Sequence, residues 1–166
     1  MNRLDRRWRR RSSPVIWTAA AVAAVVIAAV VAGTALAWRS PVAERAATSD
    51  ALAGQAGTIV ADVFSADAST WTADRERARA LMAEPFASSV AAGLTGQPPA
   101  GVASVRWEPL TSGVVSVDEH AGTAVVVARV VVTPTAGQPE TRVKSVNADF
   151  VHTDGRWLLS GVDELR

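Results

Sequence analysis

The stretch GTAVVVARVVVTP at residues 122–134 is dominated by β-branched side chains, which favour an extended backbone. It predicts a strand that ends at Pro134, and residues 134–139 predict a loop. Segments of similar character predict further strands at residues 102–110, 113–120, 141–152 and 156–162. Asp154-Gly155, before the last of these, is typical of a two-residue hairpin. The short connections predict an antiparallel sheet.

The predicted strand at residues 141–152 shows which side of that sheet is buried. Side chains alternate between the two faces of a strand. Val146, Ala148 and Phe150 therefore share one face, and Ser145, Asn147 and Asp149 share the other. This division predicts a curved sheet with one face packed under helices.

The segment before the strands has helical periodicity. From residue 42 to about residue 65, apolar side chains recur at the spacing of one helix face, and we expect that face to be buried. Its members are Leu52, Ala56, Ile59, Val60 and Val63.

A second helix is expected after residue 71, with Thr72 as its N-cap and Asp74 in its first turn. Arg75, Arg77 and Arg79 alternate with other residues along it, which predicts a solvated charged face. Glu84-Pro85 is expected to end this helix or to begin the next one, with Pro85 at its first helical position. The helical segment after Pro85 is expected to continue to Gly96.

Helices that precede a run of antiparallel strands indicate the α+β class. A long twisted sheet that wraps around N-terminal helices is similar to the cone-shaped, nuclear-transport-factor-2-like (NTF2-like) architecture. We therefore expect residues 39–166 to form one domain of this type.

Charge is distributed unevenly along the chain. Residues 1–14 hold six Arg and one Asp, a net charge of +5, and residues 15–38 hold no charged side chain. Residues 39–166 hold eleven basic and fifteen acidic side chains, a net charge of −4. The apolar block at residues 15–37 would span about 34 Å as a helix, which is enough to cross a bilayer. The sequence thus predicts a basic cytoplasmic tail (1–14), a transmembrane helix (15–38) and an extracytoplasmic domain (39–166).

The ends of this predicted span carry side chains that favour the membrane interface. They are Arg9, Arg10, Arg11, Trp17, Trp38 and Arg39. The excess of Arg before the span places the N-terminus in the cytoplasm. Ala35-Leu36-Ala37 has the form of an export cleavage site, so a cleaved signal is the alternative. The block is longer than the apolar region of an ordinary signal peptide, which favours an uncleaved anchor.

Several function classes are disfavoured by composition. The chain has no Cys, which excludes disulfides, thiolate metal sites and a Cys nucleophile. A domain with a net charge of −4 is poorly suited to nucleic acid. No phosphate-binding loop, dinucleotide fingerprint or nucleophile motif is present. We expect no cofactor and no resident metal, and we expect the protein not to be an enzyme.

A few residues are nevertheless candidates for a ligand pocket or a partner surface. Asp149 is the best acid–base candidate if it faces inward, although Val146 and Phe150 compete for that face. His120 and His152 are expected at turns and strand ends. Trp107 and Trp157 are expected on strands, where they fill the core of the sheet or line a concave mouth. Trp71 is expected between helices, either packed in the core or in contact with a partner.

The whole layout resembles the Mce-associated membrane proteins of actinobacteria. The resemblance rests on the Arg-rich tail and single span, and on four further segments. These are AERAATSDALAGQAGTIVADVF (43–64), AAGLTG (91–96), AVVVARVVV (124–132) and DGRWLLSGVDEL (154–165).

The resemblance implies a non-enzymatic accessory subunit that assembles or stabilises an Mce-type importer of lipids such as sterols or fatty acids. Its partners would be Mce and permease subunits in the cell envelope. One alternative is a VirB8-like scaffold of a secretion or conjugation system. The other is an NTF2-like pocket that binds a small ligand or catalyses a reaction, and the sequence identifies no ligand for it.

Overall fold

The computed structural model describes residues 42–90 and 96–165. The predicted tail, the predicted transmembrane helix and their interface residues Arg9, Arg10, Arg11, Trp17, Trp38 and Arg39 lie outside these ranges. Within residues 42–90 and 96–165, no helix is both long enough and apolar enough to cross a membrane. Residues Glu44–Arg166 form one compact unit of the chain, and the fold described below is the fold of that unit.

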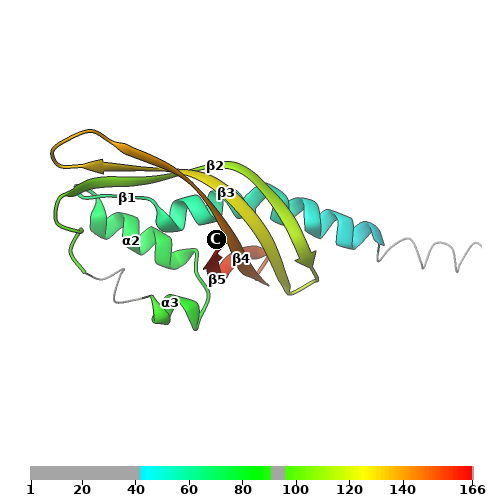
Figure 1. Cartoon of the computed structure of the whole chain (residues 1–166). Helices are drawn as coiled ribbons and strands as arrows, with labels where there is room; N and C mark the ends of the chain where they lie inside the picture. Colours follow the sequence, from blue (N-terminus) through cyan, green and yellow to red (C-terminus); the bar gives the residue numbers. More distant parts are fainter. Residues whose placement is uncertain (1–41, 91–95, 166) are drawn as a thin grey trace, which may run out of the picture. The chain divides into compact units, whose positions relative to one another are not determined.

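Residues 42–64 are helical, as the periodicity predicts. We refer to them as the long helix, which runs from cyan to green in Figure 1. Its predicted apolar face is buried, and Leu52, Ala56 and Val60 are completely inaccessible to solvent. Burial of this face stabilises the helix more than intrinsic propensity does.

Three short elements follow the long helix. They are strand β1 (Ala66–Asp67), helix α2 (Trp71–Ala80) and helix α3 (Phe86–Ser89). The predicted N-cap of α2 is wrong by two residues, because Thr70 rather than Thr72 occupies that position. The hydroxyl of Thr70 donates to Asp74 one turn later, which ties the preceding turn to the helix.

Helix α3 is shorter than the sequence predicts. Pro85 is its N-cap, one residue before the helix starts, and the helix ends at Ser89 with Val90 as its C-cap. The predicted continuation to Gly96 is therefore wrong at Val90, and residues 91–95 lie outside the described residues.

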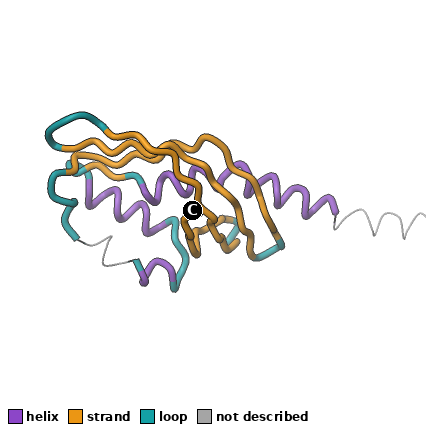
Figure 2. The backbone as a smooth tube through the Cα atoms, viewed as in Figure 1, coloured by secondary structure: helices purple, strands orange, loops and turns teal. Residues whose placement is uncertain are grey.

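The remaining strands are β2 (Val102–Val117), β3 (Ala121–Pro134), β4 (Glu140–Thr153) and β5 (Arg156–Glu164). Together with β1 they form one antiparallel sheet in the order β1-β2-β3-β4-β5. Figure 2 shows the strands curving together beside the helices. The predicted α+β class and curved antiparallel sheet are therefore confirmed.

The two predicted strands at residues 102–110 and 113–120 are in fact one strand, β2. Thr111 and Ser112, which separate the two predicted strands, themselves pair with β3. The register shifts between Pro109 and Thr111 and again between Val114 and Ser116. Such bulges accommodate an extra residue in one strand of a pair, and they also bend that strand.

The turns between the later strands follow the sequence closely. Asp154 and Gly155 join β4 to β5 and both have positive φ, at 51° and 73°. That combination matches the right-handed twist of the flanking strands, which confirms the predicted hairpin. The loop between β3 and β4 occupies residues 135–139, as expected from its proline and glycine.

The core lies between the long helix and one face of the sheet, which we call the inner face. Val126, Val146 and Phe150 on this face are at most 2 % exposed, and they pack with Leu52 and Leu159. Helix and sheet approach closely at Gly122, where an added Cβ would overlap the Cδ2 atom of Leu52. Burial of these apolar side chains is the main stabilising contribution.

Candidate functional site

The structure distributes the candidate residues over separate parts of the domain. Trp157 is 4 % exposed and belongs to the core. Its ring lies 4.7 Å from that of His152, measured between centroids. The backbone N–H of His152 donates to the carbonyl of His120, in the β2–β3 turn, at 2.7 Å. Trp157 and His152 are therefore part of the packing at the hairpin end of the sheet.

Asp149 lies on the face of the sheet opposite the core, which we call the outer face. Its neighbours in sequence, Ala148 and Phe150, are buried on the inner face. The carboxylate accepts a hydrogen bond of 2.8 Å from the Thr123 hydroxyl on β3. It also lies against Gly161 on β5, where an added Cβ would be 3.4 Å from Oδ2. The residue thus links three strands on the outer face.

Trp107 and Trp71 lie near the junction of the long helix, α2 and β2. Trp107 is half-buried on β2, and its ring centroid is 5.2 Å from that of Phe64 at the end of the long helix. The backbone N–H of Trp107 donates to the Ser65 hydroxyl at 2.9 Å. The indole N–H of Trp71, on α2, donates to the Gly96 carbonyl at 2.6 Å. Both tryptophans therefore take part in contacts that connect the helices to the segments beside them.

Arg75 departs from the predicted solvated face of α2. Its guanidinium lies 4.9 Å from the ring centroid of Trp71 and donates to the Ser65 carbonyl. Burial lowers the pKa of Arg75 from its ordinary value. Arg77 and Arg79 are exposed as predicted. The Trp71–Arg75 spacing of four residues on a helix is the signal in the sequence that identifies this contact.

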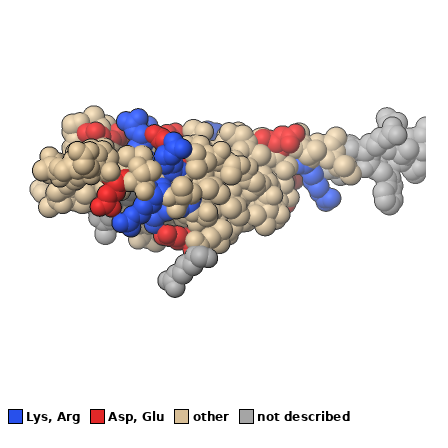
Figure 3. Space-filling view, turned by 45° about the horizontal axis from the view of Figure 1, so that its top comes forward, with Lys and Arg blue, Asp and Glu red and all other residues tan. Residues whose placement is uncertain are grey.

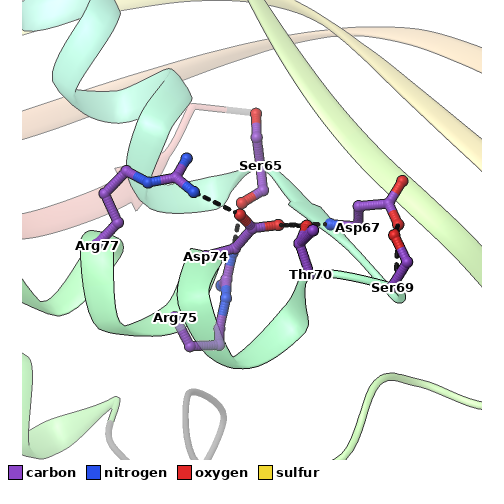
Figure 4. A network of polar contacts seen from close by, with 7 residues as sticks. All are labelled: Ser65, Asp67, Ser69, Thr70, Asp74, Arg75 and Arg77. Carbon is purple, nitrogen blue, oxygen red and sulfur yellow. Dashed lines mark hydrogen bonds and ion pairs between the residues drawn. The ribbon is translucent and has the colours of Figure 1, made fainter.

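Asp74 is the centre of the polar network at the start of α2, which Figure 4 shows. Its side chain is 13 % exposed. It accepts hydrogen bonds from the Asp67 backbone N–H at 2.9 Å and from the Thr70 hydroxyl at 2.8 Å. Arg77 contributes an ion pair at 2.8 Å. The Asp67 N–H, Thr70 and Arg77 together hold the pKa of Asp74 below its ordinary value, because they favour the charged form.

Asp67 extends this network into the turn before α2. Its carboxylate accepts the backbone N–H of Ser69 at 2.8 Å and also the Ser69 hydroxyl. These two hydrogen bonds lower the pKa of Asp67. The β1–α2 turn is thus ordered by two aspartates, which bind its backbone N–H groups.

A depression of about 450 Å³ adjoins this network. We call it the α2 depression. Its walls come from the end of the long helix, β1, α2 and β2, and Trp107 and Pro109 add apolar surface. Its charged residues are Asp62, Asp67, Asp74, Arg77, Arg106 and Glu108. A surface of both charge signs beside an aromatic ring is suited to contact with a polar partner surface.

A second depression of about 300 Å³ lies at the β2–β3 turn and includes Asp118, Thr123 and Asp149. The backbone N–H groups of His120 and Ala121 donate to the Asp118 carboxylate, each at 2.8 Å, and lower its pKa. Asp118 therefore orders the turn. In residues 42–90 and 96–165, no three His, Asp or Glu side chains converge as metal ligands.

Comparison of the chain with models of protein families, with curated proteins and with solved structures gave no match.

Proposed function

We propose that the chain is a non-enzymatic accessory subunit of an Mce-type lipid import complex in an actinobacterial cell envelope. In this proposal residues 15–38 anchor it in the cell membrane with the N-terminus in the cytoplasm. Residues 39–166 then form an extracytoplasmic domain of NTF2-like type. The resemblance of the sequence to Mce-associated membrane proteins is the starting point of this proposal.

The space between the long helix and the inner face of the sheet is filled by apolar side chains, and this observation supports a docking role. In the described domain, Leu52, Val60, Val63, Phe150 and Leu159 fill the space between the long helix and the sheet, each at most 2 % exposed. Charged and aromatic groups gather instead around the α2 depression, at the surface of the domain. Such a domain offers its partners a surface, and a surface is what an assembly subunit needs.

A membrane anchor would make this docking effective even if the contact is weak. Two proteins held in the same membrane meet at a high effective concentration, so modest affinity suffices for assembly. The domain would hold importer subunits together through surface contacts. Charged groups around the α2 depression would orient those contacts more than they would strengthen them.

Co-purification tests this proposal directly. The full chain, tagged after Arg166, is expressed in its own host and purified from membranes in mild detergent. We expect Mce and permease subunits to co-purify, and an unrelated single-span protein with the same tag serves as the control. We also expect the amounts of these subunits to fall in a deletion strain and to recover when the gene is restored.

The proposal is rejected if no importer subunit co-purifies and importer amounts are unchanged in the deletion strain. Recovery of secretion or conjugation components in place of importer subunits would support the VirB8-like alternative instead. Partner identity therefore separates the two assembly roles, which share the same anchor and domain type.

A further inference from the structure

Strand β4 has an edge that is only partly covered. It pairs with β3 from Glu140 onward, but its pairing with β5 begins at Val146. One further hydrogen bond joins the Leu165 N–H to the Ser145 carbonyl at 2.9 Å. Among the described residues, positions 140–143 therefore have a neighbouring strand on one side alone. We call these four residues the open edge, and Figure 1 shows this part of β4 close to the β3–β4 loop.

The backbone of the open edge is available for further pairing. The Ser145 carbonyl points away from β3, because it bonds Leu165. Backbone groups reverse direction at each residue of a strand, so those of Val143 and Thr141 also point away from β3. All four residues are exposed, and Val143 is 64 % exposed. Thr and Val are also residues that favour strand pairing.

Other sheet edges in the described domain are less suited to pairing. The edge of β2 beyond β1 is interrupted by two bulges and by Pro109, which has no N–H to donate. The far edge of β5 is occupied near its middle, because the Leu159 N–H and carbonyl bond Leu81 and Ala83. The open edge of β4 keeps a regular register with β3 throughout.

The open edge carries one acidic and one basic side chain, so two copies of it can match each other in charge. Glu140 and Arg142 lie two residues apart on the same face of β4 and form an exposed ion pair of 3.1 Å. Figure 3 shows acidic and basic side chains beside one another in a band across the surface. Charges of one sign on an edge strand oppose pairing of two copies. If two copies run antiparallel with Thr141 opposite Thr141, Glu140 of each copy faces Arg142 of the other.

We propose that the open edge joins two copies of this chain through antiparallel β4–β4 pairing around a two-fold axis. The sheet then continues from one copy into the other. The contact is isologous, so each copy contributes the same residues and the dimer is closed. This proposal does not depend on the importer role, because it rests on strand geometry and charge alone.

In this register residues 140–142 of the two copies pair with one another, and Val143 faces Pro139, which has no N–H to donate. The interface is therefore small, and the dimer is expected to be weak and concentration-dependent. Its specificity then comes from register. A register centred on Arg142 would place two arginines opposite each other, which is repulsive.

Charge reversal tests both the surface and the register. In the proposed dimer, positions 140 and 142 face each other at two symmetric places. Arg142→Glu makes both of these contacts acidic against acidic, and Glu140→Arg makes both of them basic against basic. We expect each variant to raise the self-association Kd of the full chain in detergent by about tenfold. In a one-to-one mixture, a heterodimer of the two variants places the two acidic side chains of one copy opposite the two basic side chains of the other. Every contact between positions 140 and 142 then joins opposite charges. We therefore expect the mixture to form heterodimers with close to the wild-type Kd.

Arg156→Glu is the matched control, because Arg156 is an exposed arginine at the hairpin end of β5, away from the open edge. We expect it to leave the self-association Kd unchanged. Thermal unfolding of every variant checks that the domain remains folded. Sedimentation equilibrium over a range of concentrations gives the Kd values, and differently tagged copies report the heterodimer.

Crosslinking is a second test, because the chain has no Cys of its own. Thr141→Cys places two thiols opposite each other in the proposed register, and oxidation is expected to give a covalent dimer. Thr135→Cys, in the exposed β3–β4 loop, is expected to crosslink far more slowly. The proposal is overturned if the full chain is monomeric at all concentrations. It is equally overturned if the mixed charge variants fail to associate, or if both Cys variants crosslink at the same rate.

Discussion

Asp74 shows how a single side chain organises the junction before α2. A carboxylate near the start of a helix is favoured by the helix dipole. Here the same carboxylate also receives the N–H of Asp67, seven residues earlier in the chain, and the Thr70 hydroxyl. The acidic position was predictable from the sequence. Its partner on β1 was not, because that contact depends on how the turn folds back.

We predict that Asp74→Ala lowers the free energy of unfolding by about 1 kcal/mol at neutral pH, because it removes hydrogen bonds to a charged group near the surface. The pKa of Asp74 is lower in the folded than in the unfolded state. Its contribution is thus present above the ordinary pKa of 3.8 and is lost as the pH falls through the folded value. Urea unfolding of wild type and variant should show a difference that shrinks below about pH 4.

Glu76→Ala is the control for this measurement, since Glu76 is exposed on the same helix. We expect it to change stability little. A difference between wild type and Asp74→Ala that stayed constant from neutral pH to about pH 2 would contradict the assignment.

Arg75 and Arg77 provide a matched pair of arginines on one helix. We predict that Arg75→Lys destabilises the domain by about 1 kcal/mol, because lysine loses both the planar contact with Trp71 and the geometry that reaches the Ser65 carbonyl. Arg77→Lys retains a charge beside Asp74 on an exposed side chain and should have little effect. Thermal or urea unfolding measures both, and equal effects would show that neither the Trp71 contact nor the Ser65 hydrogen bond stabilises the domain.

At the level of elements, the long helix and the β4–β5 hairpin follow from local sequence patterns. The apolar stripe of the long helix and the Asp154-Gly155 turn were both predicted, because each depends on residues close together in the chain. β2 was predicted as two strands, and it contains Pro109 and Gly113, which are residue types that ordinarily interrupt strands. Pairing with β3 keeps β2 continuous, and the local sequence of β2 does not predict that pairing.

Replacement by alanine is expected to have opposite effects on stability at two glycines. Gly54 lies in the long helix with open space where a Cβ would be, so Gly54→Ala should stabilise the domain by about 0.5–1 kcal/mol. Gly155 has a φ of 73° in the hairpin, so Gly155→Ala should destabilise it by about 1 kcal/mol. Denaturant unfolding measures both, and a stabilising Gly155→Ala would contradict the turn conformation.

At the level of the whole molecule, charge distribution is the main guide to where the domain acts. The first fourteen residues carry a net charge of +5 and residues 39–166 carry −4. Positive charge beside an apolar block is retained in the cytoplasm. The proposed arrangement therefore has the described domain outside the cytoplasm, tethered to the membrane by residues 15–38.

We predict that alkaline phosphatase fused after Arg166 is active, because the enzyme folds only after export. A cytoplasmic reporter such as green fluorescent protein exported by the same route should stay dark. Replacing Arg9, Arg10 and Arg11 by Glu should reduce phosphatase activity, since it changes the net charge of residues 1–14 from +5 to −1. Phosphatase activity that is absent in the wild-type fusion would reject the proposed orientation.

The sequence by itself determined the α+β class, the long helix with its buried face, and the alternation that turns Asp149 outward. These features depend on periodicity and turn chemistry within short stretches of chain. Tertiary structure alone decided that β2 is one strand, that Arg75 folds back onto Trp71, and that β5 leaves residues 140–143 of β4 open. Each of these depends on which segments become neighbours in the folded domain, and long-range pairing is set by the packing of the whole domain.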